Sequence, residues 1–188
     1  KTLSCKDLPI KLTGYSMCFR KEIGAHGIDE RGLFRTHQFN KQEMVVICRP
    51  EDSYKYYEEL LSLSKDLFKK LKIPIRELES CSGDLSDLKA KGSDLEAWSP
   101  RQNKYFEITS ITNMEEAQAR RLNIKFTDEK NNRKFVHTLN NTAIATSRAL
   151  VAIMENYQQK DGSIKIPEVL IPYMNGKKII RKKINASS

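Results

Sequence analysis

Short strand-like runs outnumber helical ones in this chain, and several follow one another directly along the sequence. Runs rich in β-branched, aromatic and apolar residues, broken by turn residues, predict extended segments at residues 15–20, 33–39, 43–49, 75–81, 94–98, 105–112 and 134–139. Strands that are neighbours in sequence pair most simply as antiparallel neighbours in a sheet. The pattern therefore predicts an α+β fold, in which helices flank a mostly antiparallel sheet.

Two long helices are expected beside this sheet. Apolar side chains recur at helical spacing over residues 52–72 and 143–158, and a shorter helix fits residues 115–122. Pro74 stops the first helix, and Asn141 or Thr142 can cap the start of the last one. The segment 166–170 is predicted to be extended.

The composition indicates an ordinary globular protein with a polyanionic partner. Of the 188 residues, 39% are hydrophobic and 30% are charged, and no apolar run is long enough for a transmembrane helix. The net charge of +9 favours nucleic acid, nucleotides or anionic lipid. Part of that charge gathers in the C-terminal tail, which is either a solvated tail or an RNA contact. Its basic residues are Lys177, Lys178, Arg181, Lys182 and Lys183.

Cysteine usage points to the cytosol and away from a structural zinc site. The four cysteines are widely spaced, and none forms the close pairs typical of zinc ligands. We therefore interpret them as reduced thiols of a cytoplasmic protein.

Phosphate binding, if the chain does it, must depend on arginine side chains. Neither of the two common glycine-rich phosphate loops is present among the eight glycines. A guanidinium suits phosphate oxygens, and strand alternation would place Arg20 and Glu22 on one face. Arg35 and Phe39 would share a face in the same way. The competing interpretation is an Arg–Glu ladder on a sheet surface, and physics alone favours that ladder.

A family resemblance favours the phosphate-binding interpretation over the surface ladder. Phe19-Arg20-Lys21-Glu22, followed by a loop and by the run from Arg31 to Phe39 and Glu43, resembles motif 2 of class II aminoacyl-tRNA synthetases in its seryl form. Residues 138–143, leading to Arg148 and then to 155–158, resemble motif 3. Residues 94–98 and 107–110 resemble the strand pair between the motifs, and 167–170 the C-terminal strand. The resemblance extends from about Leu8 to Tyr173 and implies a class II synthetase-like antiparallel sheet flanked by helices.

The resemblance implies an ATP site around Arg20. Arg20 would be the catalytic residue, gripping the α-phosphate and the substrate carboxyl oxygen, where a fixed cation stabilises the charge that develops in the transition state. Glu22 would accept from the adenine amino group and Phe39 would stack on the base. The other residues that the resemblance assigns to ATP are Lys21, Arg35, Thr36, Glu107, Ile108, Thr109, Ser110 and Arg148. Glu107 and Ser110 would also bind Mg2+, which prefers oxygen ligands.

The same resemblance implies that the amino acid is L-serine. Glu43 would hold its ammonium group, and Arg20, Asn140 and Thr142 would complete the site. The serine carboxylate would displace pyrophosphate from ATP to give seryl-adenylate, and the tRNA(Ser) terminal ribose would then take the seryl group. A protein nucleophile is not needed, so His37 is interpreted as structural and His137 as a half-buried strand residue. Capping alone would also explain Thr142, and Glu107 could simply face solvent.

The chain is expected to be the C-terminal portion of a longer cytoplasmic enzyme that does not enter the membrane. It lacks an initiator methionine, and the family's helical hairpin, its motif 1 dimer element and its Thr-x-Glu loop do not precede Lys1. Residues 1–175 would form a partial catalytic domain and 176–188 a basic tail, and the full-length enzyme would be a homodimer.

Two alternatives stay open at this stage. A related synthetase could load a small amino acid onto a carrier protein, or a non-catalytic RNA-binding module could have kept the fold. Three acidic groups among the site residues argue against a purely basic RNA surface.

Overall fold

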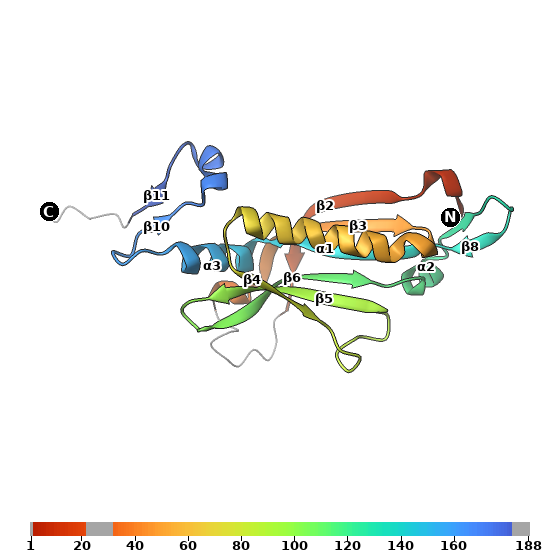
Figure 1. Ribbon diagram of the computed structural model, residues 1–188, viewed down its shortest axis with the longest axis horizontal. Coiled ribbons are helices and arrows are strands. Elements are labelled where there is room, and N and C mark those ends of the chain that lie inside the picture. Colours follow the sequence, from red (N-terminus) through yellow and green to blue (C-terminus); the bar gives the residue numbers. More distant parts are fainter. Residues whose placement is uncertain (1, 22–31, 182–188) are drawn as a thin grey trace.

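A six-stranded antiparallel sheet forms the centre of the protein, as the sequence predicts (Figure 1). The computed structural model describes residues 2–21 and 32–181. Each pair of neighbouring strands runs antiparallel. In spatial order the strands are β2 (Ile10–Phe19), β3 (Gln38–Cys48), β9 (His137–Ala145), β6 (Lys104–Asn113), β5 (Lys91–Ser99) and β4 (Ile75–Glu79).

Helix α1 (Ser53–Lys70) runs along one face of this sheet (Figure 1). Its buried side chains recur at helical spacing, so a single stripe faces the strands. Tyr57 and Phe68 are fully buried in that stripe. Helix α3 (Thr146–Tyr157) continues from the end of β9 and adds Ala149 and Ala152 to the same core. On β3 the core face carries Met44, Val46 and Cys48, and burial raises the pKa of the Cys48 thiol to about 12.

Asn141 connects the helix to two strands of the sheet. Its side chain is completely buried in β9. The amide nitrogen donates to the Leu60 carbonyl (2.7 Å) and to the Ser64 hydroxyl (2.8 Å) of α1, and the amide oxygen accepts from Thr109 of β6 (3.2 Å). Both donor positions and one acceptor position of this amide are therefore used, and the two donated bonds fix α1 against the sheet.

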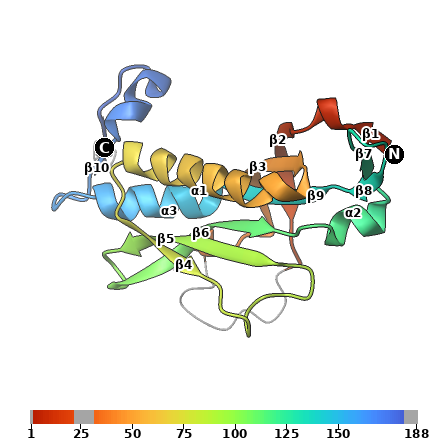
Figure 2. The ribbon, with the colours of Figure 1, turned by 45° about the vertical axis from the view of Figure 1, so that its right-hand side comes forward.

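Smaller elements lie at the two ends of the sheet (Figure 2). At one end α2 (Ala117–Leu122) packs beside a three-stranded sheet of β1 (Thr2–Ser4), β7 (Lys125–Thr127) and β8 (Arg133–Phe135) around a second small core. At the other end β10 (Ile164–Lys165) pairs with β11 (Ile179–Ile180), and a 3-10 helix, η5 (Glu168–Met174), connects them. Two further 3-10 turns, η1 (Cys5–Asp7) and η4 (Pro50–Asp52), precede β2 and α1. In the described part of the chain, no helix is long and apolar enough to cross a bilayer.

Three expectations from the sequence were wrong in detail. Residues 33–39 are not one strand, because Gly32 adopts a left-handed φ of +65° and opens the 3-10 turn η3 (Gly32–Phe34). Residues 166–170 are not extended, since η5 begins at Glu168. Neither Asn141 nor Thr142 caps a helix, because β9 continues to Ala145 and α3 begins only at Thr146. In both residues the side chain bonds to another element instead.

We predict that Asn141→Ala destabilises the fold by roughly 2–4 kcal/mol, because the hydroxyls of Ser64 and Thr109 lose their buried partner. Urea denaturation followed by circular dichroism measures the change. Asn132→Ala is the matched control: its exposed side chain donates to the Asp128 carboxylate at 3.4 Å, and its effect should stay within about 0.5 kcal/mol. Equal effects of the two substitutions would show that Asn141 does not connect these elements.

Candidate functional site

A cavity of about 230 Å³ lies over the sheet face that points away from the core. Because side chains alternate along a strand, Phe39, Lys41 and Glu43 of β3 point to the face opposite Met44 and Val46. The residues lining the cavity come from β3, β6, β9, α3 and the segments before β3. They are Arg20, Phe34, Arg35, Thr36, Phe39, Lys41, Glu107, Ile108, Thr109, Ser110, Thr142, Ala145, Ser147 and Arg148.

A β-bulge at Ile108 directs two side chains into this cavity. Glu107 pairs with Glu96 and Thr109 pairs with the next residue, Leu95, so Ile108 is an extra residue in β6. In a regular strand Glu107 and Ser110 would point to opposite faces, but one extra residue brings them to the same face. Thr109 then points inward, where it is 2% exposed and donates to Asn141.

A second irregularity, at Ala143, aligns β9 with β3. Gln42 pairs with Ile144 and Glu43 pairs with Thr142, which leaves Ala143 without a partner. Pairing is regular from Glu43 to Cys48, so Thr142 and Asn140 lie on the face of Glu43 while Asn141 between them points into the core. The extra residue brings Ala145 onto the face of Thr142, and both line the cavity. The buried amide and the polar group around Glu43 thus depend on one register.

The Glu43 carboxylate accepts two hydrogen bonds and forms one ion pair with neighbouring side chains. Asn140 donates to Oε1 (3.0 Å), Thr142 donates to Oε2 (3.1 Å), and the Lys41 ammonium lies 2.9 Å from Oε2. The carboxylate is partly buried, with 23% of its side chain exposed. Two neutral donors and one cation therefore hold it in a fixed position.

Cations and an aromatic ring occupy the rest of the cavity. The Arg20 guanidinium lies over the Phe39 ring, 5.3 Å from its centroid. Arg148 donates to the Glu107 carbonyl (2.9 Å) and pairs with the Glu107 carboxylate (3.2 Å). The buried Thr36 hydroxyl has no partner among the described residues. Cations beside a stacking surface and an unpaired donor suit an anionic, planar ligand such as a nucleotide.

The structure brings together most of the site residues expected from the sequence. Arg20, Arg35, Thr36, Phe39, Glu107, Ile108, Thr109, Ser110, Thr142 and Arg148 all line the cavity. Asn140 and Glu43 lie next to Thr142 but outside that lining, and Lys21 is exposed and does not line it. Glu22 lies outside the described residues. Arg35 precedes β3, so the shared strand face expected for Arg35 and Phe39 was wrong, although both line the cavity.

Four lining residues were not expected: Phe34, Lys41, Ala145 and Ser147. The spacing of two residues between Lys41 and Glu43 was a readable signal, because it places them on one face of a strand. Phe34 packs edge-on against Phe106, with ring centroids 5.0 Å apart, and only the turn at Gly32 brings it there. That turn could not be read from the pattern of apolar residues.

The two histidines among the described residues, His37 and His137, contact the backbone and the core side of the sheet. The Arg20 amide donates to the His37 carbonyl (2.9 Å), and His37 Nδ1 lies 3.2 Å from the Arg20 carbonyl, so His37 fixes the chain at Arg20. His137 is partly buried in β9, with Nδ1 3.0 Å from the Ser53 hydroxyl. Both interpretations from the sequence agree with these positions.

Known proteins similar to this chain carry tRNA-ligase names. Residues 1–157 match the tRNA synthetase class II core domain (G, H, P, S and T). The chain is 56% identical to the serine–tRNA ligase of Methanocella arvoryzae over 91% of its own length and 41% of that protein. It is 58% identical to the serine–tRNA ligase of Picrophilus torridus over 89% of its length and 38% of that protein.

Solved structures give the same picture. The seryl-tRNA synthetase of Pyrococcus horikoshii complexed with ATP superposes with a TM-score of 0.91 at 49% identity, covering 96% of this chain and 40% of that one. The cytoplasmic serine–tRNA ligase of Naegleria fowleri in complex with AMP gives a TM-score of 0.90 at 44% identity, covering 98% of this chain and 43% of that one. The chain thus spans about two fifths of the length of these relatives.

His137 gives the fold a pH dependence that can be measured. Burial lowers the pKa of His137 from its ordinary value of 6.5, against the opposing charges of Glu115, Glu116 and Glu51. The unfolded chain therefore binds a proton more readily than the folded one, so this contribution to stability is present above pH 6.5 and lost as the pH falls below it. His137→Asn should flatten the fall in unfolding free energy between pH 7.5 and 5.5. An unaltered fall in the His137 variant would contradict the assignment.

Proposed function

Because the chain belongs to the tRNA synthetase class II core domain family, we propose that its cavity activates L-serine with ATP, as the catalytic centre of a serine–tRNA ligase. The observation that carries the proposal is the placement of Arg20. Its guanidinium lies over the ring of Phe39, an aromatic surface for a base, and it lines the same cavity as Thr142, which bonds to Glu43. A cation in that place can bind the α-phosphate and the serine carboxylate at the same time.

ATP fits the cationic side of the cavity. Phe39 stacks on adenine from one side, and Arg148 provides a planar cation for its other side or for the γ-phosphate. Arg35 binds the terminal phosphates, and Glu22 accepts from the adenine amino group. Thr36, Lys21 and the strand segment 107–110 complete the nucleotide site. As the serine carboxylate attacks the α-phosphorus, Arg20 stabilises the negative charge that builds there.

Mg2+ suits the donor set of Glu107 and Ser110. The Ile108 bulge brings their oxygens to one face, and among the described residues no cluster of three or more histidine, cysteine or acidic side chains could hold a metal by itself. Two protein oxygens, with phosphate oxygens and water as the remaining ligands, match the usual coordination of this ion. The ion would neutralise phosphate charge, while Arg148 keeps the Glu107 carboxylate oriented.

Serine would bind where Glu43, Asn140 and Thr142 meet. Glu43 holds the ammonium group, and the Thr142 hydroxyl and the Asn140 amide provide polar partners for the serine hydroxyl. Alanine lacks the hydroxyl that would bond to these part-buried groups, so the site can discriminate against it. Threonine must be excluded by the size of the pocket instead.

The whole enzyme would then transfer the seryl group to tRNA(Ser). In this proposal residues 1–175 form part of a catalytic domain, residues 176–188 form a basic tail, and the full-length enzyme is a cytoplasmic homodimer. The carrier-protein alternative shares the first step and differs only in the acceptor. Offering tRNA and a carrier protein in parallel to the activated amino acid separates the two.

We predict that Arg20→Ala abolishes serine-dependent ATP–pyrophosphate exchange, with a loss of at least about 100-fold, because no other group replaces the cation at the α-phosphorus. Arg76→Ala is the matched control. Arg76 also lies over an aromatic ring, 4.6 Å from the Tyr105 centroid, but Arg76 and Tyr105 do not line the cavity. Exchange that survives in the Arg20 variant would remove this mechanism.

We predict that Phe39→Leu weakens ATP binding roughly 5- to 100-fold, because stacking on a base is worth about 1–3 kcal/mol. Tyr105→Leu, the same kind of change at the ring beneath Arg76, should leave ATP binding unchanged. Isothermal titration calorimetry measures both. Equal ATP affinities for the Phe39 variant and the unaltered protein would exclude Phe39 as the base platform.

We predict that the 188-residue chain alone exchanges pyrophosphate more slowly than a longer chain that also carries motif 1, since no Thr-x-Glu loop of the kind that touches serine in the family precedes Phe19 in it. Initial rates of exchange at saturating serine and ATP give the comparison. Turnover of the short chain close to that of the longer one would contradict this expectation.

A further inference from the structure

Lys41 occupies a position on Glu43 that the function proposed above requires for the substrate. Its ammonium lies 2.9 Å from Glu43 Oε2, on the atom that also accepts from Thr142. Lys41 and Glu43 are two residues apart on β3 and share a face, and 28% of the Lys41 side chain is exposed. An ammonium group is thus already bound at the carboxylate that would receive the ammonium of serine.

The lining of the cavity supports this interpretation. Lys41 and Thr142 line it, whereas Glu43 and Asn140 do not. The two residues that contact Glu43 Oε2, Lys41 and Thr142, are thus the ones that the carboxylate shares with the cavity lining. Two ammonium groups close together at one carboxylate repel each other, so the amino acid binds well only after Lys41 has moved.

The cavity also contains the means of moving it. Arg20, Arg35, Lys41 and Arg148 give the lining four cations against the single carboxylate of Glu107. Triphosphate oxygens among these cations would offer Lys41 a second anionic partner. A lysine ammonium on a flexible stem can exchange one anion for another by rotation of its side chain.

We propose that Lys41 is a positioning residue that holds Glu43 as an internal counter-ion and releases it when the nucleotide binds, so that ATP opens the amino subsite for serine. This proposal rests on the proposed function, because it takes Glu43 as the ligand of the substrate ammonium. Asn140 and Thr142 keep Glu43 in place after Lys41 has left, since their hydrogen bonds do not involve the lysine. The result is positive coupling between the two substrates through one side chain.

The test is a set of serine titrations with and without α,β-methylene-ATP, which cannot be cleaved between its α- and β-phosphates. In the unaltered protein the analogue should tighten serine binding roughly fivefold or more. Lys41→Met keeps a stem of similar length without the charge. In that variant serine should bind without nucleotide about as tightly as it binds the unaltered protein with nucleotide, and the analogue should change its affinity less than about twofold.

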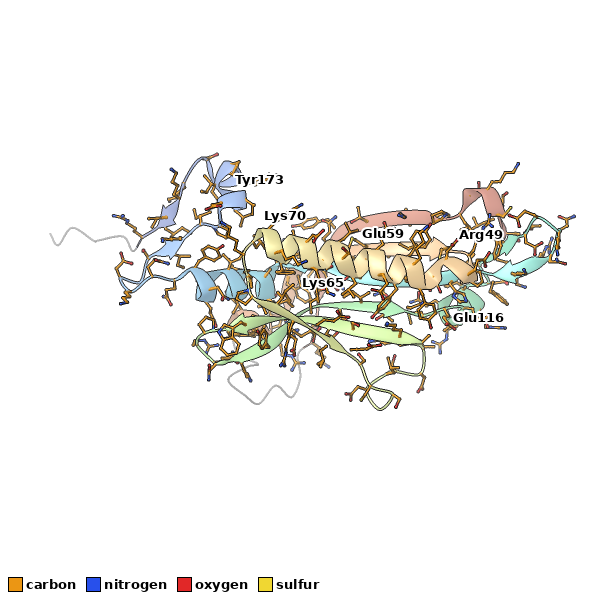
Figure 3. The ribbon with its side chains drawn as sticks, viewed as in Figure 1. Arg49, Glu59, Lys65, Lys70, Glu116 and Tyr173 are labelled. Atoms are coloured by element: carbon orange, nitrogen blue, oxygen red, sulfur yellow. The ribbon has the colours of Figure 1, made fainter. Side chains whose placement is uncertain are left out.

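Two further variants separate a coupling role from a structural one. Lys41→Arg restores the positive charge and should restore the coupling. Lys65 of α1 is a lysine of similar exposure, 32%, and its ammonium lies 2.6 Å from the Glu77 carboxylate of β4 (Figure 3). Lys65→Met should leave the coupling unchanged. Circular dichroism and thermal melting confirm that each variant is folded.

The outcomes that overturn the proposal are distinct. Coupling of unaltered size in Lys41→Met would show that Lys41 plays no part in it. Weaker serine binding in that variant, both with and without the analogue, would show that Lys41 binds the substrate directly. Absence of serine binding to the unaltered protein in both titrations, with the analogue still bound, would overturn the proposed function as well. Loss of coupling in Lys41→Met with its return in Lys41→Arg supports the proposal.

Discussion

Two bulge residues, Ile108 in β6 and Ala143 in β9, have no partner residue on the neighbouring strand, and they determine which side chains of the sheet face the cavity. Alternation along a regular strand would send Glu107 and Ser110 to opposite faces. One extra residue per strand removes this conflict without a loop, and the site stays on hydrogen-bonded strands. Rigid strands hold functional groups more precisely than loops do, which matters for a reaction that depends on positioning.

The same register holds the core together. Asn140 and Thr142 face Glu43, and Asn141 between them bonds to α1 and to Thr109. A slip of one residue in β9 would bury the two site residues and expose the core amide. The register of β9 therefore decides stability and the geometry around Glu43 together, and substitutions in this strand are expected to affect both.

The main features of the fold could be predicted from the sequence because they depend on local patterns. The apolar stripe of residues 52–72 and the strand-like runs predicted α1 and the antiparallel sheet. Contacts between distant elements could not be read in this way. Thr142 has the side chain of a helix cap, yet β9 extends past it, because Thr142 bonds to Glu43 of β3 and the neighbouring Asn141 bonds to α1.

The site followed a similar division. The resemblance to a family supplied the arginines, the acidic residues and Phe39, but not Lys41, whose role depends on its distance to Glu43. The bulges could not be predicted from the sequence either, since one extra residue in a strand does not change the composition of the strand. The 3-10 turn that carries Phe34 depends on the left-handed backbone of Gly32, a choice that glycine permits but does not require.

In the proposed mechanism one cavity holds the nucleotide and serine, joined at the α-phosphate beside Arg20. The most direct measurement is calorimetric titration with a non-hydrolysable seryl-adenylate analogue and with its alanyl counterpart. The account predicts that the seryl analogue binds far more tightly than ATP or serine alone, and at least about 100-fold more tightly than the alanyl analogue. Equal affinities for the two analogues, or a seryl analogue no tighter than ATP, would contradict it.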